Sequence, residues 1–269
     1  MEKRKAFTLI ELLVVISIIA LLLAIMMPAL GMVKEKAKNL VCKSNLRSIS
    51  LACSIYGEEH NGKLMEYRAY QLFLRQLEPY VGNMDEIRYC PSTKINESNT
   101  EAGKNGWGSS TEAWWWWLDD TWEEPEFGSY GMNGWMYTYT DSMGYIVGGE
   151  RGRMWGNLSA VKQASKTPFF VDAIWVDLWP MDTDTIPGTY KLDTGGGGYD
   201  AGGGSTGSPG NHIQRCVTDR HNGSVDMAFV DGHTENIKLA ELWSVTWNKG
   251  WNVQHDVTRT DDTPIDRKR

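Results

Sequence analysis

The sequence predicts an α+β protein in which a long N-terminal helix packs on a small antiparallel β-sheet domain with long loops. Three observations predict this class. An apolar run of membrane length begins close to the N-terminus, and it continues directly into an amphipathic segment. Short runs rich in β-formers, such as 169–171 and 224–230, follow in the second half. The length of 269 residues accommodates one membrane helix and one sizeable globular domain.

A basic leader, residues 1–6, precedes the apolar run that extends from residue 12 to residue 30. About 20 apolar residues span a bilayer. Glu11 stands near the start of this run, where a carboxylate costs roughly 3 kcal/mol on insertion scales, so it requires a cationic partner. If the chain is cut before Phe7, the new N-terminal amine of Phe7 would be such a partner. The basic leader predicts that the N-terminus stays in the cytoplasm.

This segment, K-A-F-T-L-I-E-L-L-V-V-I-S-I-I-A-L-L, resembles the prepilin leader of type IV pilins and type II secretion pseudopilins. In that family a peptidase cuts before the apolar segment, and the new N-terminal Phe is N-methylated. The resemblance implies cleavage between Ala6 and Phe7, although the family usually has Gly where Ala6 stands. Pro28 falls 22 residues into the implied mature chain (28 minus 6), where pilin helices commonly carry a proline.

Three other interpretations of the N-terminus compete. An ordinary secretory signal has a shorter apolar core followed by an A-x-A-like site. An uncleaved signal anchor fits the length but leaves Glu11 unexplained. A buried core helix would be as apolar, but the basic leader argues against it. We therefore expect a leader at 1–6, a membrane-spanning helix at 7–30, its amphipathic continuation at 31–60 and a globular domain at 61–269.

The amphipathic continuation is predicted to cover the domain with an apolar stripe and to stop at Asn61-Gly62. The stripe consists of Val33, Ala37, Leu40, Val41, Leu46, Ile49, Cys53 and Tyr56. The same segment is similar to the C-x-x-N-L-R stretch of a pseudopilin-like branch with a C-terminal H-x9-D-G motif, here His221 through Asp231-Gly232. Further marks of that branch occur in the expected order at 90–92, 130–133 and 242–247.

The H-x9-D-G motif is expected to form a hairpin at 221–239. Residues 224–230 alternate as a strand does, and Asp231-Gly232 is a type I′ turn signal in which both residues take positive φ. An extended strand would separate His221 from Asp231 by more than ~20 Å, so the two cannot share a proton or a metal. His221 is then a structural hydrogen-bonding residue, near Trp243, and the motif predicts no metal site.

Elsewhere the sequence predicts a helix at 71–81, buried strand pieces at 169–171 and 174–176, and a mobile Gly-rich loop at 195–210. Oxygen ligands for Ca²⁺ are present in and beside this loop, but a solvated acidic loop is the favoured account. These ligands are Asp182, Asp184, Asp193 and Asp200.

Four cysteines allow up to two disulfides if the domain faces an oxidising compartment. They are Cys42, Cys53, Cys90 and Cys216. Because Cys42 and Cys53 lie about 16 Å apart on one helix, each would have to pair with Cys90 or Cys216. Free, buried thiols are the alternative.

Charge argues against a nucleic-acid partner. The formal charge of −7 becomes −9 once the leader, with one Glu and three basic residues, is removed, and phosphate binding requires clustered Lys and Arg.

The 13 Trp include a run at Trp114, Trp115, Trp116 and Trp117. This run suits either glycan stacking or packing, whereas packing is preferred for Trp175, Trp243 and Trp247.

The leading functional hypothesis is a non-enzymatic filament subunit, a pseudopilin. The resemblance implies as partners the prepilin peptidase, other pseudopilins and the assembly platform of the inner membrane, with a single-pass anchor and the C-terminal domain in the periplasm or at the cell surface. A membrane-anchored, Trp-rich glycan-binding adhesin is the second hypothesis. A surface hydrolase using His221 and His233 ranks last, because no G-x-S-x-G, H-E-x-x-H or nucleotide loop occurs.

Overall fold

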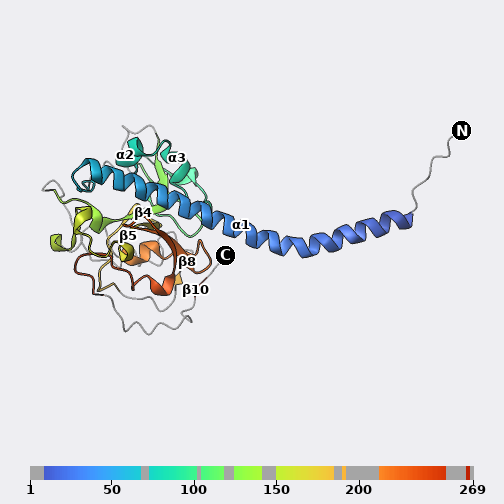
Figure 1. The fold of residues 1–269 in the computed structure, drawn as a ribbon. Coiled ribbons are helices and arrows are strands. Elements are labelled where there is room, and N and C mark those ends of the chain that lie inside the picture. The colour runs from blue at the N-terminus through green and yellow to red at the C-terminus, as the bar shows by residue number, and fades with distance from the viewer. Residues whose placement is uncertain are drawn as a thin grey trace.

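One long helix dominates the computed structural model, which describes residues 9–67, 73–101, 104–117, 124–140, 150–184 and 212–252 and the backbone of 190–191 and 265–266. Helix α1 runs from Leu9 to Glu59, 51 residues, with Pro28 inside it. At 1.5 Å per residue it is about 76 Å long. Figure 1 shows its first half projecting from the globular domain along a curved path and its second half lying in the domain.

Helix α1 ends where the sequence predicts. Asn61 and Gly62 both take positive φ, at 56° and 79°, and the Gly62 N–H donates to the Gly57 carbonyl at 2.7 Å. This left-handed pair satisfies a carbonyl of the last turn, as helix C-caps do.

Only the last third of α1 packs on the domain. The buried positions are Cys42, Asn45, Leu46, Ile49, Ser50, Ala52, Cys53 and Gly57. The predicted stripe is therefore wrong in its first half, because Val33, Ala37, Leu40 and Val41 are exposed. Helical periodicity identifies an apolar face without identifying what covers it.

A five-stranded sheet in the order β6-β4-β5-β8-β9 forms the centre of the domain. Its pairings are antiparallel except for β4 with β6, which is parallel. The α+β class is confirmed, with one parallel edge added to the expected antiparallel sheet. The strands are β4 Tyr130–Asn133, β5 Pro168–Asp172, β6 Asp177–Leu178, β8 Ser224–Phe229 and β9 Thr234–Lys238.

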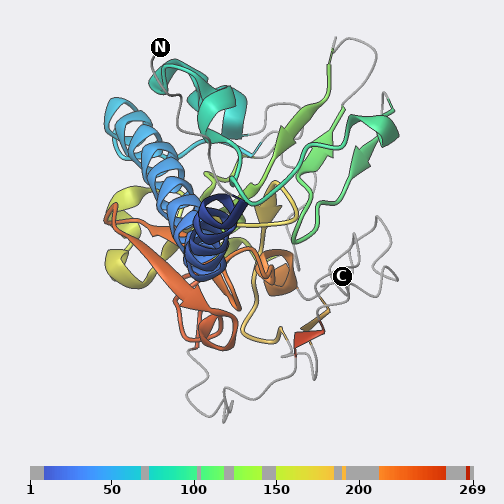
Figure 2. The same ribbon diagram turned by 90° about the vertical axis from the view of Figure 1, so that its right-hand side faces the viewer.

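Helix α1 lies between this sheet and two short helices. It contacts β5, β8 and β9 on one side and α2 (Phe73–Leu77) and α3 (Met84–Ile87) on another. Figure 2, which looks along the projecting half of α1, shows these helices and the β8–β9 hairpin on opposite sides of it. The buried face of α1 is therefore part of the domain core.

Smaller elements complete the described chain. A second sheet joins β1 (Asn105–Gly106), β2 (Trp114–Trp116) and β3 (Glu126–Gly128), and β7 (Tyr190–Lys191) pairs in parallel with β10 (Ile265–Asp266). The helix expected at 71–81 is α2 followed by a short 3-10 helix at Glu78–Tyr80, whose Pro79 cannot donate to the preceding turn. Residues 169–171 lie in β5 as expected, but 174–176 form a bend between β5 and β6.

The β8–β9 hairpin closes with a different turn from the one predicted. The Phe229 N–H donates to the His233 carbonyl, which leaves residues 230–232 as a three-residue connection. Gly232 has φ 86°, whereas Asp231 is not among the residues with positive φ. The predicted type I′ turn is therefore wrong, and the connection is the longer type in which one left-handed Gly follows the turn.

Large aromatic side chains fill much of the domain core. The most completely buried include Trp114, Trp135, Trp243, Trp247, Tyr130, Phe169 and Phe170. Asn133 joins two parts of this core, because its amide donates to the carbonyls of Pro168 and Trp247, both at 2.9 Å. The predicted packing role of Trp175, Trp243 and Trp247 agrees with their burial.

We expect Leu46→Ala to destabilise the domain by about 3 kcal/mol, because Leu46 is 0% exposed on the buried face of α1 and its truncation leaves a cavity. That loss corresponds to a Tm lower by roughly 6 to 12 °C for a domain of this size. Tryptophan fluorescence of the full chain in detergent measures it. Leu51→Ala is the matched control, since Leu51 is 59% exposed on the same helix; equal shifts in both variants would contradict the packing of α1.

Candidate functional site

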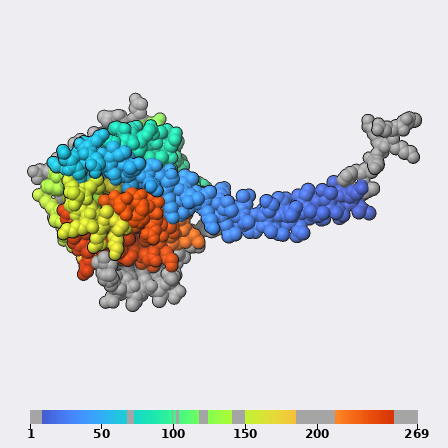
Figure 3. Space-filling view, viewed as in Figure 1, coloured from blue at the N-terminus to red at the C-terminus, as the bar shows by residue number. Residues whose placement is uncertain are grey.

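The first candidate site is the projecting half of α1, whose apolar side chains are exposed in the part of the chain that the structure describes. Its most apolar window has a mean hydropathy of 3.0, and none of that window is buried. Figure 3 shows this half standing clear of the domain. Glu11 is exposed in its first turn, while Ala6 and Phe7 lie outside the described residues. By length and composition, the segment is able to cross a membrane.

Three exposed apolar side chains lie along the outside of α1 beyond the membrane-length segment, with exposed polar residues at 44, 47 and 48 between the first and the second. Leu40, Leu51 and Ile55 are 68%, 59% and 40% exposed although they lie on the part of the helix that reaches the domain. Spacings of 11 and 4 residues place them on one face. The exposed apolar surface of α1 therefore extends to the side of the domain.

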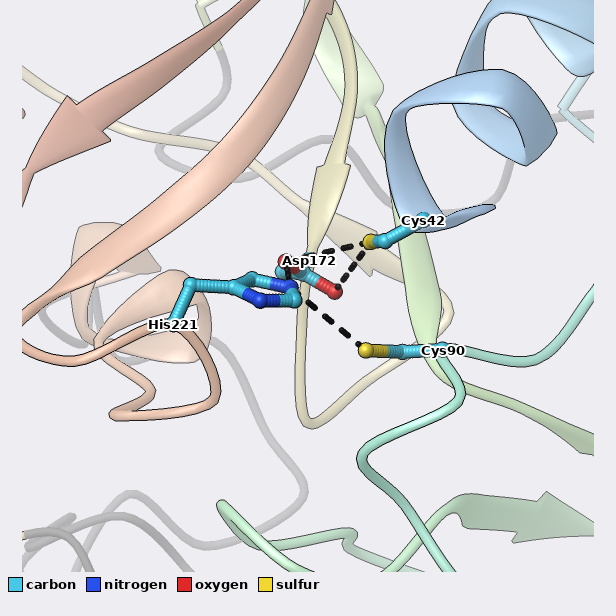
Figure 4. Close-up of side chains that lie close together, drawn as sticks. All are labelled: Cys42, Cys90, Asp172 and His221. Atoms are coloured by element: carbon cyan, nitrogen blue, oxygen red, sulfur yellow. Dashed lines mark hydrogen bonds and ion pairs between the residues drawn. The ribbon is translucent and has the colours of Figure 1, made fainter. Parts of the chain in front are cut away.

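The second candidate site is a buried polar cluster where α1 enters the domain. Four side chains from four segments converge there, and their ligand-type atoms all lie within 4.8 Å of one another. Figure 4 shows them pointing toward one another. They are Cys42 on α1, Cys90 in the turn after α3, Asp172 at the end of β5 and His221 just before β8.

His221 lies at the centre of this cluster. Its Nε2 is 3.0 Å from Asp172 Oδ2, 3.3 Å from Asp226 Oδ2 and 3.5 Å from Cys90 Sγ. The sheet brings the two carboxylates together, because pairing of β5 with β8 places Asp172 beside Asp226, whose N–H donates to Asp172 Oδ2 at 3.1 Å.

Arg220 supplies a fixed positive charge next to the cluster. Its guanidinium is fully buried and lies 3.5 Å from Asp172 Oδ1. It also donates to the carbonyls of Ser129, Ser109 and Ala173. The side chain therefore fixes the start of the H-x9-D-G motif to three other segments by charge-assisted bonds.

The ionisation of the cluster follows from these contacts. Burial alone would lower the pKa of His221, but the hydrogen bonds with Asp172 and Cys90 and the charges of Asp172 and Asp226 together outweigh burial and raise that pKa to about 10. Burial alone would raise the pKa of Asp172, but His221 and Arg220 lower it. The hydrogen bond with Cys42 lowers the pKa of Cys90 to about 6, while burial raises the pKa of Cys42. In these surroundings Cys90 is readily deprotonated.

All four cysteines are free and buried. Of the two alternatives that the sequence leaves open, the structure therefore has free thiols and not disulfides. Of the two helix cysteines, Cys42 has Cys90 beside it. The Cys216 thiol donates instead to the Ile213 carbonyl at 3.0 Å.

His221 and Asp231 make separate interactions, as their separation along the strand predicts. Asp231 Oδ1 lies 2.5 Å from His233 Nδ1 at the exposed turn. The predicted neighbour of His221 was wrong, because the indole of Trp243 donates to the Asp184 carbonyl at 2.9 Å and the contacts of His221 are with Asp172, Asp226 and Cys90.

Of the four aspartates considered for Ca²⁺, Asp193 and Asp200 lie outside the described residues, as does the Gly-rich loop at 195–210. Asp182 pairs with Arg153 at 2.8 Å. Asp184 is buried and accepts the N–H groups of Met181 and Ile213. Ca²⁺ binding, the less favoured of the two accounts, is not tested at Asp193 and Asp200.

The Trp run divides between core and surface. Trp114 is fully buried and donates to the Tyr130 carbonyl at 3.1 Å, whereas Trp115, Trp116 and Trp117 are half-buried. Trp116 lies against Trp175 with ring centroids 5.3 Å apart, and both line a pocket of about 110 Å³.

Comparison with known protein families identifies the N-terminal segment. Residues 1–27 match the prokaryotic N-terminal methylation motif. The motif, followed by the long apolar helix, is consistent with the type IV pilin-like superfamily and indicates a prepilin-like substrate of the prepilin peptidase. It points to membrane anchoring and to a structural subunit assembled in a pilus or pseudopilus.

The match covers the N-terminal segment alone. Searches of curated proteins and of solved structures returned no match to the chain.

Sequence reasoning missed Asp172, Asp226 and Arg220. One signal was present, since Asp172 ends the apolar run Phe169-Phe170-Val171 and Asp226 interrupts another in β8. A carboxylate within a buried strand requires a partner.

We expect Arg220→Gln to destabilise the domain by about 3 kcal/mol, because it removes one of the two cations beside the buried Asp172 together with charge-assisted bonds to three carbonyls. Denaturant unfolding of the full chain in detergent measures this loss. Arg75→Gln is the control, since Arg75 pairs with Glu126 while 43% exposed, and its loss costs about 1 kcal/mol or less. Similar costs for the two variants would show that the Arg220 pair is not structurally important.

Proposed function

We propose that this chain is a structural subunit, a pseudopilin, of a type II secretion or type IV pilus-like filament. The match of residues 1–27 to the methylation motif carries the proposal. In this account the peptidase removes residues 1–6, the helix enters the inner membrane, and the domain faces the periplasm or the cell surface. Other pseudopilins and the assembly platform are its partners.

The exposed apolar surface of α1 supports this role. In the membrane, lipid covers it, and in a filament the helices of neighbouring subunits cover it. The exposed side chains of Leu40, Leu51 and Ile55 offer neighbouring subunits further apolar contacts beyond the lipid.

Glu11 sets the register between subunits in this mechanism. Its carboxylate meets the methylated amine of a neighbour's Phe7, and the pair offsets the insertion cost of roughly 3 kcal/mol only when the helices are aligned. The amine of its own chain, one helical turn away, is the rival partner.

A glycan-binding adhesin is the second candidate. The pocket lined by Trp116, Trp175, Trp179 and Tyr67 favours it. Its volume of about 110 Å³ is well below the roughly 300 Å³ at which ligand pockets begin, so packing explains these rings better. Retention of the full chain on a polysaccharide array, lost in Trp116→Ala, would favour the adhesin.

The hydrolase hypothesis gains no support from the described residues. His233 lies at the exposed turn with Asp231, apart from the cluster around His221. Cys90 is 0% exposed, so its sulfur is closed to a substrate.

We expect Glu11→Val to insert normally but to abolish filaments, because the variant loses the charge that aligns neighbouring helices while becoming easier to insert. Carbonate extraction of membranes measures insertion, and electron microscopy of sheared fractions measures filaments. Glu35→Val is the matched control, since Glu35 is an exposed acid on the same helix outside the apolar run. Normal filaments from Glu11→Val would refute the register mechanism.

A further inference from the structure

The geometry points to a metal site that is independent of the filament role. We propose that one structural zinc ion binds inside the domain, held by Cys42, Cys90, Asp172 and His221.

Distances within the cluster are close to those of a zinc site. Zinc bonds of about 2.0 to 2.3 Å in a tetrahedron place ligand atoms roughly 3.3 to 3.8 Å apart. Cys42 Sγ lies 3.5 Å from Asp172 Oδ1, and Cys90 Sγ lies 3.5 Å from His221 Nε2. His221 Nε2 and Asp172 Oδ2 are 3.0 Å apart. Shifts of less than about 1 Å convert this arrangement into a tetrahedron.

The donor set selects the metal. Two thiolates, an imidazole and a carboxylate suit zinc, whereas Ca²⁺ and Mg²⁺ prefer oxygen ligands alone. Four protein ligands complete a tetrahedral shell without a water molecule, which is typical of structural rather than catalytic zinc. The burial of all four side chains fits a closed site.

Charge balance permits a dication. Once the ion has displaced the protons of His221 and of the two thiols, the thiolates and Asp172 carry three negative charges in a buried space. Zinc reduces this total to one negative charge, and the buried guanidinium of Arg220 beside Asp172 neutralises the remainder. The negative charge of Asp226 is balanced separately by Lys43, whose Nζ lies 4.0 Å from Asp226 Oδ1.

Outer contacts hold two of the four ligands in place. The Tyr130 hydroxyl donates to Cys42 Sγ at 3.4 Å, and the Asp226 N–H donates to Asp172 Oδ2 at 3.1 Å. Such contacts orient the ligands of metal sites. Asp226 Oδ2 lies 3.3 Å from His221 Nε2, the nitrogen that would bind the ion, so this contact gives way when zinc binds.

The ion would fasten α1 to the domain. It joins the point where α1 enters the core to the turn after α3, to β5 and to the start of the hairpin.

A groove between residues 219–222 and the α1 residues Gly31, Lys36 and Asn39 reaches His221 and provides an entry path for the ion. The rival chemistry at the same place is a disulfide between Cys42 and Cys90.

Metal analysis of the full chain purified in detergent tests the proposal. We expect one zinc per chain by mass spectrometry of metals, lost in Cys42→Ser, Cys90→Ser and His221→Ala. Cys53→Ser and Cys216→Ser are matched controls, because both residues are buried free cysteines outside the cluster, and we expect them to retain the ion. Zinc that persists in Cys42→Ser, or that is absent from the wild type, would overturn the site.

A second measurement does not depend on any variant folding. Cobalt replaces zinc in the wild-type chain under reducing conditions, and we expect thiolate-to-cobalt charge-transfer absorption together with the intense visible bands of tetrahedral coordination. A metal-free wild type that shows neither signal, or one with a Cys42–Cys90 disulfide by mass spectrometry, would refute the inference. Filament formation is not a readout in either experiment, so failure of the filament proposal leaves this test intact.

Discussion

The whole structure depends on one constraint: α1 is a continuous helix whose two parts need different surroundings. Its first part exposes almost every apolar side chain, and its last part is buried in the domain. Exposed apolar surface costs about 25 cal/mol per Å² in water, so the first part requires lipid or neighbouring helices. A domain rigidly attached to such a helix is carried wherever the helix assembles, which is the property that a filament subunit needs.

The buried polar cluster lies at the junction between these two parts. Asp172, Asp226, Arg220 and His221 are buried charged groups that compensate one another, and Cys42 brings α1 into the same cluster. Hydrogen-bonded charges in a core favour one geometry over alternatives, whereas apolar contacts tolerate sliding. The cluster thus fixes how α1 meets the sheet. Both the H-x9-D-G histidine and the cysteine of the C-x-x-N-L-R stretch belong to it.

Local features were predictable from the sequence, and non-local ones were not. The long helix, its stop at Asn61-Gly62 and the β8–β9 hairpin follow from periodicity and turn residues. The stripe at Val33 to Val41 was misassigned because lipid-facing, neighbour-facing and domain-facing apolar residues have the same spacing. The turn type was wrong because only Gly232 takes positive φ. The partners of His221 come together only through the register of β5 on β8, which no local pattern encodes.

The mass of the mature N-terminus tests the central claim most directly, because every later step of the account requires the peptidase to release a new amine near Glu11. Intact mass and N-terminal peptide analysis of the protein from its native membrane should give a chain that begins at Phe7 and carries one additional methyl group. A chain that still begins at Met1, or one cut after the apolar segment, would contradict the account.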